Sequence, residues 1–270
     1  MTVPTHSSRV QLCPLLLAAA VSLGCDDAAN EISGAGDGQP GESVVIAFIG
    51  DQGWEPAGQA DGPRAVLQLI KDEGADAVMH QGDFDYLDDP AAWEQQIDDI
   101  LGPDFPYFVS VGNHDTGEWE GVGGYKERMQ QRAQRLGIAW YGELGEIAAL
   151  HFQSIHLLFG APGTLGSDPT VYADFFASVL AADTSTWRIC SWHKNQRLMQ
   201  VGGKSDEAGW EVYETCRVGG AIIATAHEHS YSRTHLLSNG RYTVMVTAAG
   251  SGFSRWRELA VTRWREDTTR

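Results

Sequence analysis

SVGNHDTGE, at residues 110–118, follows the apolar run FPYFV at 105–109, which has the composition of a buried strand. Gly112 ends that run, and the polar triplet Asn-His-Asp follows at 113–115. Polar side chains at the mouth of a buried strand cost free energy unless another group satisfies them. The stretch is therefore either an ordinary turn, which Gly, Asn and Asp favour, or part of a binding site.

Two earlier segments repeat this pattern. SVVIAFIGD at 43–51 and DAVMHQGD at 76–83 are apolar runs that end in Gly-Asp, and both are expected to be strands. The segments 61–74 and 89–102 between the strands have the periodicity of amphipathic helices. Polar residues thus follow successive strands, and ligands bind at the carboxyl ends of strands in open α/β sheets.

The remaining chain also alternates between strands and helices. Further helices are expected at 124–137, 171–183 and 206–220. Residues 147–160 fit two strands or one long bent strand, and other strands are expected at 186–194 and 221–229. A hairpin is expected over 235–250, with Asn239-Gly240 as its turn. This order predicts an α/β fold, a four-layer αββα sandwich of two mixed sheets flanked by helices.

The polar side chains near the predicted strand ends form a set that suits metal binding. They are Asp51, Asp83, Tyr86, Asn113, His114, His193, His227 and His229. Alternate residues on a strand face one side, so His227 and His229 can bind one cluster of ions. Mixed oxygen and nitrogen ligands suit first-row transition metals. One tetrahedral ion takes about four ligands, so the set without His114 predicts two ions that share Asp83. Such a pair can hold a phosphoryl group and activate water.

These motifs and their order resemble those of the calcineurin-like metallophosphoesterases. The motifs are GD at 50–51, GD at 82–83, GNHD at 112–115, the lone His193 and HEH at 227–229. The resemblance covers about residues 44–250 and implies the two-sheet sandwich as the fold. Two details resemble the purple acid phosphatase branch, in its short single-domain form. Gly53 stands where most of the family has a metal-binding His, and Tyr86 follows Asp83 by three residues.

The resemblance also implies a role for each position. The ligands it implies for ferric iron are Asp51, Tyr86 and His229, with Asp83 bridging to a second ion. The ligands it implies for that second ion, which would be zinc, manganese or ferrous iron, are Asn113, His193 and His227. His114 would contact the phosphate or protonate the leaving oxygen, and Asp115 would orient His114. Ala226 departs from the family's usual Gly before HEH, and Asp115 replaces the branch's usual Glu.

The charge balance restricts the partners. The chain has 36 acidic and 19 basic residues and a net charge of −17, which argues against a nucleic-acid-binding surface. A small phosphorylated substrate would need a local positive field, which two metal ions supply. We therefore expect an enzyme that hydrolyses phosphate monoesters by attack of a metal-bound hydroxide. The alternatives are a phosphodiesterase or nucleotidase of the same superfamily, and a surface lipoprotein that binds metal without catalysis.

The N-terminus predicts export. Residues 1–25 have the features of a signal peptide of the bacterial lipoprotein type, in which SLGC presents Cys25 for lipidation. Residues 26–43 form an acidic, flexible linker, and 44–270 form the metallophosphoesterase catalytic domain. The protein would be a cell-envelope lipoprotein, bound to the membrane only through its lipid anchor, or would be secreted. The sequence does not indicate an oligomeric state.

Several residues outside the motifs leave alternatives open. Cys190 and Cys216 form a disulfide or remain two free buried thiols. Lys194, Asn195 and Arg233 carry polar groups that could contact phosphate. His80 is expected to pack near the site, and no role is assigned to His151 and His156.

Overall fold

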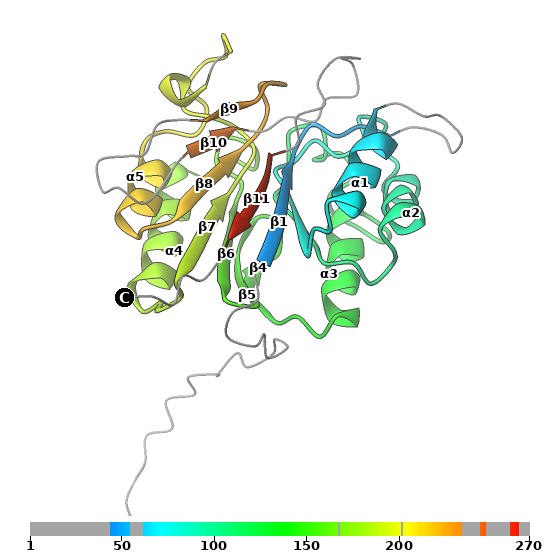
Figure 1. The fold of residues 1–270 in the computed structure, drawn as a ribbon. Coiled ribbons are helices and arrows are strands. Elements are labelled where there is room, and N and C mark those ends of the chain that lie inside the picture. The colour runs from blue at the N-terminus through cyan, green and yellow to red at the C-terminus, as the bar shows by residue number, and fades with distance from the viewer. Residues whose placement is uncertain are drawn as a thin grey trace, which may run out of the picture. The chain divides into compact units, whose positions relative to one another are not determined.

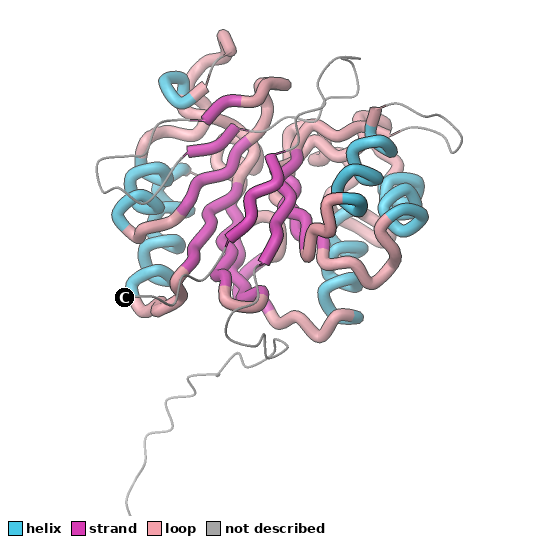
Figure 2. Tube along the Cα trace, viewed as in Figure 1, coloured by secondary structure: helices cyan, strands magenta, loops and turns pink. Residues whose placement is uncertain are grey.

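The structure is a computed structural model that describes residues 44–54, 62–166, 168–200, 202–233, 244–246 and 260–264. These residues form two β-sheets in the middle with helices on both outer sides (Figure 1). Figure 2 shows the same layers, with the strands between two groups of helices. Both sheets contain parallel and antiparallel neighbours. The expected αββα sandwich of two mixed sheets is confirmed.

The first sheet carries the three β–α units predicted from the Gly-Asp motifs. Its order is β11-β1-β2-β3, in which β1 (Val44–Ile49), β2 (Ala77–His80) and β3 (Tyr107–Val109) are parallel. The edge strand β11 (Ala260–Trp264) pairs antiparallel with β1 and was not predicted from the sequence. The helices on this side are α1 (Pro63–Asp72), α2 (Pro90–Ile100) and α3 (Tyr125–Arg135). Pro63 and Pro90 begin their helices, where the missing N–H costs nothing.

The second sheet has the order β4-β5-β6-β7-β8-β10-β9. Its strands are β4 (Trp140–Glu143), β5 (Ile147–Phe152), β6 (Ile155–Gly160), β7 (Trp187–Ser191), β8 (Ile222–Thr225), β9 (Ser232–Arg233) and β10 (Val244–Val246). Residues 147–160 therefore form two strands, joined by a turn at Gln153, rather than one bent strand. The helices on this side are α4 (Pro169–Ala181) and α5 (Glu211–Val218), with a short 3₁₀ turn at Arg197–Met199.

Some expectations near the C-terminus differ from the structure or lie beyond it. The helix expected at 206–220 begins only at Glu211, and the residues before it form a loop. Strand β9 pairs antiparallel with β10 but lies before the expected hairpin at 235–250. The Asn239-Gly240 turn of that hairpin lies outside the described residues. The proposed signal peptide and linker also lie outside them.

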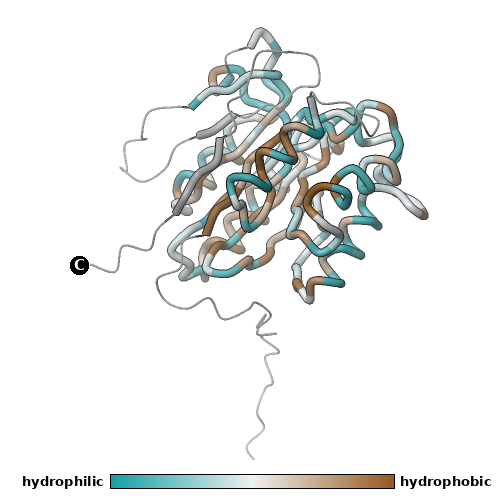
Figure 3. The backbone as a smooth tube through the Cα atoms, turned by 45° about the vertical axis from the view of Figure 1, so that its right-hand side comes forward, coloured by the Kyte–Doolittle hydropathy of each residue, from teal (hydrophilic) through white to brown (hydrophobic). Residues whose placement is uncertain are grey.

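Aromatic side chains join the two sheets across the core. Phe108 of β3 packs edge-to-face on Phe152 of β5, with ring centroids 5.4 Å apart. The Ser110 hydroxyl donates to the Ser191 carbonyl at 3.0 Å, so the sheets are also hydrogen-bonded where β3 and β7 end. Figure 3 shows the most hydrophobic segments along the central strands. Burying each such ring contributes roughly 1.5–3 kcal/mol, which makes this layer a rigid base for the loops above it.

A disulfide joins Cys190 of β7 to Cys216 of α5, with the Cα atoms 6.4 Å apart. The pair is therefore a crosslink rather than two free thiols. It fixes a helix to the strand that precedes His193. Within the described part of the chain, no helix has the length and apolar character to cross a membrane.

Candidate metal centre

The loops after the parallel strands are held together by backbone hydrogen bonds. The N–H of Asp51 donates to the Gly82 carbonyl at 2.9 Å, and that of Gln52 donates to the Asp83 carbonyl at 2.9 Å. The first two Gly-Asp motifs therefore form one unit beyond the ends of β1 and β2. Gly112 completes this unit by close approach, because a Cβ there would lie 2.2 Å from the Asp83 nitrogen. Only glycine fits that contact.

Backbone strain is concentrated at the predicted ligands. Seven described non-glycine residues have positive φ, and five of them are predicted ligands: Asp51, Asp83, Tyr86, His227 and His229. A non-glycine residue in that region costs of order 1–3 kcal/mol and persists only where the surroundings enforce it. Strained residues of this kind cluster at binding and catalytic sites, where the unusual backbone conformation directs the side chain towards the site.

His227 and His229 do not lie on a strand. Strand β8 ends at Thr225, and HEH occupies the loop after it. The expectation that strand alternation aligns the two imidazoles is therefore wrong. The loop brings both side chains to the centre in another way, because each residue has positive φ. His227 lies with the side chains around His193, and His229 lies with those around Tyr86.

The first group of side chains gathers around His193. Its Nε2 lies 3.1 Å from the Asn113 Oδ1, 3.0 Å from the His227 Nδ1 and 3.3 Å from the Asp83 Oδ2. The His193 Nδ1 donates to the Gln81 carbonyl at 2.7 Å, which leaves Nε2 unprotonated when the ring is neutral. Two imidazole nitrogens, an amide oxygen and a carboxylate oxygen therefore converge on one point. That is the donor set of a four-coordinate transition-metal site.

The second group gathers around the phenol of Tyr86. Its oxygen lies 3.1 Å from the His229 Nε2 and 3.3 Å from the Asp51 Oδ1. The His229 Nε2 and the Asp51 Oδ1 are 3.5 Å apart. The other oxygen of Asp51 accepts the backbone N–H of His227 at 3.0 Å, which fixes the carboxylate. Phenol, carboxylate and imidazole thus form a second convergent set.

Burial makes this collection of charges costly without a cation. Burial raises the pKa of Asp51 to about 7; His193 opposes this shift and Asp83 reinforces it. Burial also acts to raise the pKa of Asp83, but the hydrogen bond and charge of His193 outweigh it and bring the value to about 2. Burial and the charge of His193 lower the pKa of His227 to about 4. Bound cations would favour the charged carboxylates and neutral imidazoles, so the donor set fits metal ions.

His114 and Asp115 have different surroundings. The His114 ring is exposed and packs near the Tyr86 ring, with centroids 4.9 Å apart, at the open side of the second group. Asp115 is buried, and its carboxylate accepts backbone N–H groups of Asp83, Phe84 and Gly112 at 2.9, 2.7 and 2.6 Å. In the described structure these bonds clamp the GD and GNHD loops. This placement differs from the expected role of orienting the His114 ring.

Glu207 is a further residue of the site that was not predicted from the sequence. Its Oε2 accepts from the His227 Nε2 at 3.0 Å, and its Oε1 accepts from Lys194 at 2.8 Å. Lys204 adds a hydrogen bond to the His227 carbonyl. A carboxylate behind an imidazole fixes its tautomer and leaves Nδ1 free for a metal. No local pattern marks Glu207, because it lies in a loop 20 residues before its partner.

The residues considered for phosphate contact have other partners or positions. Lys194 pairs with Glu207, and Arg233 lies exposed on β9. Asn195 is buried: its amide donates to the Ala226 carbonyl at 2.6 Å and its oxygen accepts from Thr225 at 2.6 Å. Asn195 therefore supports the HEH loop from below. His80 is buried beneath the GD loop and accepts the Gly82 N–H at 3.1 Å, in line with packing near the site.

Comparisons with known proteins match most of the chain to one family. The family model of calcineurin-like phosphoesterases matches residues 44–231. A purple acid phosphatase from yellow lupin seeds (Lupinus luteus) is similar in structure, with a TM-score of 0.53 and 17% identity. The match covers 84% of this chain and 48% of that one, and at this identity it shows the fold alone. A dimetal phosphatase from Danio rerio has a TM-score of 0.48 and 9% identity, over 77% of this chain and 88% of that one.

The C-terminal part has a second, shorter likeness. The family model of the supersandwich domain of glycosyl hydrolase 94 matches residues 220–270. A cyclic beta-(1,2)-glucan synthase, NdvB, of Rhizobium meliloti is 59% identical over 34 residues. That match covers 13% of this chain, which spans about 1% of the length of that curated relative.

The phosphoesterase match covers well over half of the chain and contains all the predicted ligands. The two-sheet fold of this chain and its convergent donor groups are consistent with that family match. The chain belongs to the calcineurin-like phosphoesterases.

Proposed function

We propose that this protein hydrolyses phosphate monoesters in the manner of an acid phosphatase. In this proposal Asp51, Tyr86 and His229 hold Fe³⁺, and Asn113, His193 and His227 hold Zn²⁺, Mn²⁺ or Fe²⁺. Asp83 would be the shared ligand. When bound, the ions supply positive charge for the phosphoryl group and an activated water. The proposal is supported by two convergent donor sets in one family site.

The observation that carries the proposal is the position of Tyr86. Its phenol oxygen lies within 3.3 Å of both Asp51 and His229. In this proposal Tyr86 replaces the metal-binding His of most of the family, whose sequence position is Gly53 here. Burial, then the nearby Asp51, raises the pKa of Tyr86 well above its usual value. A phenolate there needs a strongly charged cation, which Fe³⁺ provides better than a divalent ion.

The other residues would position the substrate and the ions. His114 is exposed beside Tyr86, so it can donate to a phosphate or to the leaving oxygen. Asp83 accepts the His114 backbone N–H at 2.9 Å, which fixes the start of the GNHD loop relative to the centre. Glu207 would hold the His227 tautomer, and Asp115 would hold the two loops together.

The test is to purify the full chain without chelator and measure metal content together with the visible spectrum. We expect iron plus a second metal, and a phenolate-to-iron band that Tyr86→Phe abolishes. Tyr141→Phe, which changes an exposed tyrosine far from this centre in sequence, is the control and should keep the band. Two colourless metals would overturn the iron assignment. Faster hydrolysis of a diester than of a monoester would favour a phosphodiesterase or nucleotidase of the same superfamily.

We also propose that the protein is exported and anchored by a lipid on Cys25. The Cys190–Cys216 disulfide supports export, since such bonds persist in oxidising compartments. Labelling with a fatty acid analogue in a bacterial host should mark the wild-type chain and not Cys25→Ser. Equal labelling of both would contradict the lipid anchor, and release of unlabelled wild-type protein into the medium would indicate plain secretion.

A further inference from the structure

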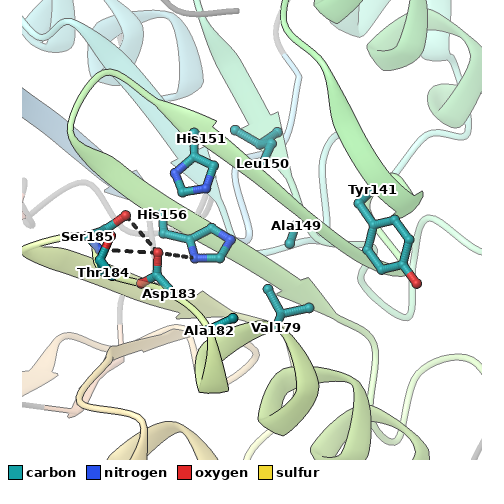
Figure 4. A pocket seen from close by; sticks show the side chains of 10 residues that line it. All are labelled: Tyr141, Ala149, Leu150, His151, His156, Val179, Ala182, Asp183, Thr184 and Ser185. Carbon is teal, nitrogen blue, oxygen red and sulfur yellow. Dashed lines mark hydrogen bonds and ion pairs between the residues drawn. The ribbon is translucent and has the colours of Figure 1, made fainter. Parts of the chain in front are cut away.

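A cavity of about 350 Å³ lies away from the metal centre, where the β5–β6 hairpin meets the end of α4. Its walls combine apolar and polar side chains. The polar ones include His151, His156, Asp183 and Ser185 (Figure 4). The phosphoesterase chemistry uses none of these residues. Two imidazoles and a carboxylate therefore lie together beside this open space.

The two histidines form a cross-strand pair. His151 of β5 and His156 of β6 are directly paired in the sheet register, and their rings stack with centroids 4.2 Å apart. Stacked imidazoles repel each other when both are protonated, so the pair favours neutral rings. A neutral ring offers a nitrogen lone pair to a metal.

Asp183 faces this pair from the segment after α4. Its Oδ1 lies 3.2 Å from the His156 Nδ1, and both side chains are buried. The pair is an ion pair only if His156 is protonated, and its geometry falls short of a hydrogen bond among the described residues. When the ring is neutral and Nδ1 carries the lone pair, both atoms are acceptors and can bind one cation between them. The edge of a tetrahedral zinc site with bonds of about 2.05 Å is about 3.3 Å, close to this distance.

The carboxylate is held firmly. Ser185 donates to the Asp183 Oδ1 from its N–H at 3.2 Å and its hydroxyl at 2.8 Å, and Arg188 pairs with the other oxygen. Hydrogen bonds of this kind orient metal-binding carboxylates in proteins. One ligand atom from each of His151, His156 and Asp183 lies within 4.8 Å of the other two. The rings would turn out of their parallel stack to direct both lone pairs at one ion.

We propose that His151, His156 and Asp183 form a peripheral binding site for a divalent first-row transition ion, Zn²⁺ by preference. Two imidazoles and one carboxylate are a common ligand set for such ions, and the cavity leaves room for a water at the remaining position. This site is separate from the dinuclear centre and does not depend on the proposed phosphatase activity. It would couple the β5–β6 hairpin to the end of α4.

The test is the number of zinc ions bound per full-length chain at saturation, measured for wild type and His151→Ala. We choose His151 because it is only partly buried, so its truncation leaves the Asp183–Arg188 pair intact. Wild type should bind one more equivalent than the variant. Co²⁺ as a probe should give visible d–d absorption at that extra equivalent in wild type only. Asp174→Asn, an exposed carboxylate on α4, is the matched control and should keep the extra ion.

Phosphoester hydrolysis distinguishes this site from the dinuclear centre, because His151→Ala should keep its activity while it loses the ion. A second variant, His156→Gln, should also lose the extra equivalent. Equal zinc stoichiometry and equal Co²⁺ spectra in wild type and both variants would overturn the proposal. The three side chains would then be an ion-pair network that only fixes the corner.

Discussion

At the residue scale, the centre depends on which nitrogen of each imidazole is free. The His193 Nδ1 bonds to the Gln81 carbonyl, and the His227 Nε2 bonds to Glu207. These outer contacts leave the His193 Nε2 facing Asn113 and Asp83, and the His227 Nδ1 facing the His193 Nε2. The two rings therefore present opposite nitrogens, Nε2 of one and Nδ1 of the other, to the same point. Glu207 thus acts on the centre through His227 and is a positioning residue.

Glu207→Ala should weaken binding of the ion at the His193 group. Loss of such an outer partner costs about 10–100-fold in metal affinity, because the imidazole can then adopt the wrong tautomer. Zinc competition against a chelator measures the effect. Glu207→Gln keeps an oxygen acceptor and should restore part of the affinity, whereas the Tyr86-dependent band should persist in both variants. Exposed Glu211→Ala is the control. An unchanged zinc affinity in Glu207→Ala would refute the positioning role.

At the element scale, the site is built by loops that continue the pairing of the strands beneath them. Gly82 and Gly112 let the second and third loops touch, since a Cβ on Gly82 would lie 2.6 Å from the Gly112 Cα. Asp115 then clamps the GNHD loop to the GD loop through backbone amides. Close backbone packing, more than side-chain contacts, sets the position of Asn113 relative to Asp83.

Gly112→Ala should lower the free energy of unfolding by on the order of 3 kcal/mol, because the new methyl group overlaps the Asp83 backbone and forces the loops apart. Urea unfolding of the metal-free protein measures this. Gly117→Ala is the matched control in the same loop, where the added carbon would meet only the Asp88 carboxylate at 3.6 Å. Equal unfolding midpoints for the two variants would contradict the close-packing account.

The disulfide should stabilise the second half of the chain. For cysteines 26 residues apart, the loop-entropy relation gives about 3.5 kcal/mol. Reductant should therefore lower the urea midpoint of wild type. Cys190→Ser should have the lower midpoint already and should not respond to reductant. A wild-type midpoint that reductant leaves unchanged would show that the crosslink carries no stability.

Strands were predicted most accurately from the sequence where an apolar run is followed directly by polar residues, a pattern that occurs three times. The apolar runs before Asp51, Asp83 and Asn113 indicated three strands whose ends meet, and the structure has them. β4 and the edge strand β11 were not anticipated, because their short segments carry no comparable boundary signal. The partnership of Glu207 with His227 was also missed. Contacts between two loops leave no periodicity, so a single sequence cannot indicate them.

At the scale of the whole molecule, buried neutral histidines link stability to pH. His80 is fully buried, and burial, with a further contribution from His193, lowers its pKa from 6.5 to about 3. The unfolded chain takes up a proton as the pH falls below 6.5, whereas the folded chain does not until about pH 3. The stability that neutral His80 contributes is therefore present above pH 6.5 and is lost as the pH falls towards 3.

His80→Asn should reduce this pH dependence. Asn keeps an acceptor for the Gly82 N–H but does not titrate. We expect the slope of unfolding free energy against pH between 6 and 4 to fall by about 1.4 kcal/mol per unit, one proton's worth. Urea unfolding of metal-free protein across that range measures the slope. Parallel curves for the two proteins would show that His80 is not the group responsible.

The family match, the two donor sets and the strained ligand backbones all lead to one claim: two ions at one centre hydrolyse a phosphate ester. The most direct test adds metal stepwise to metal-free His151→Ala protein, which removes a ligand of the proposed peripheral site, and follows phosphate release from a monoester. We predict that hydrolysis appears only with the second equivalent, and that Asp83→Asn in the same background stays inactive at any metal concentration. Full activity after the first equivalent, or wild-type hydrolysis by Asp83→Asn, would contradict the two-ion centre.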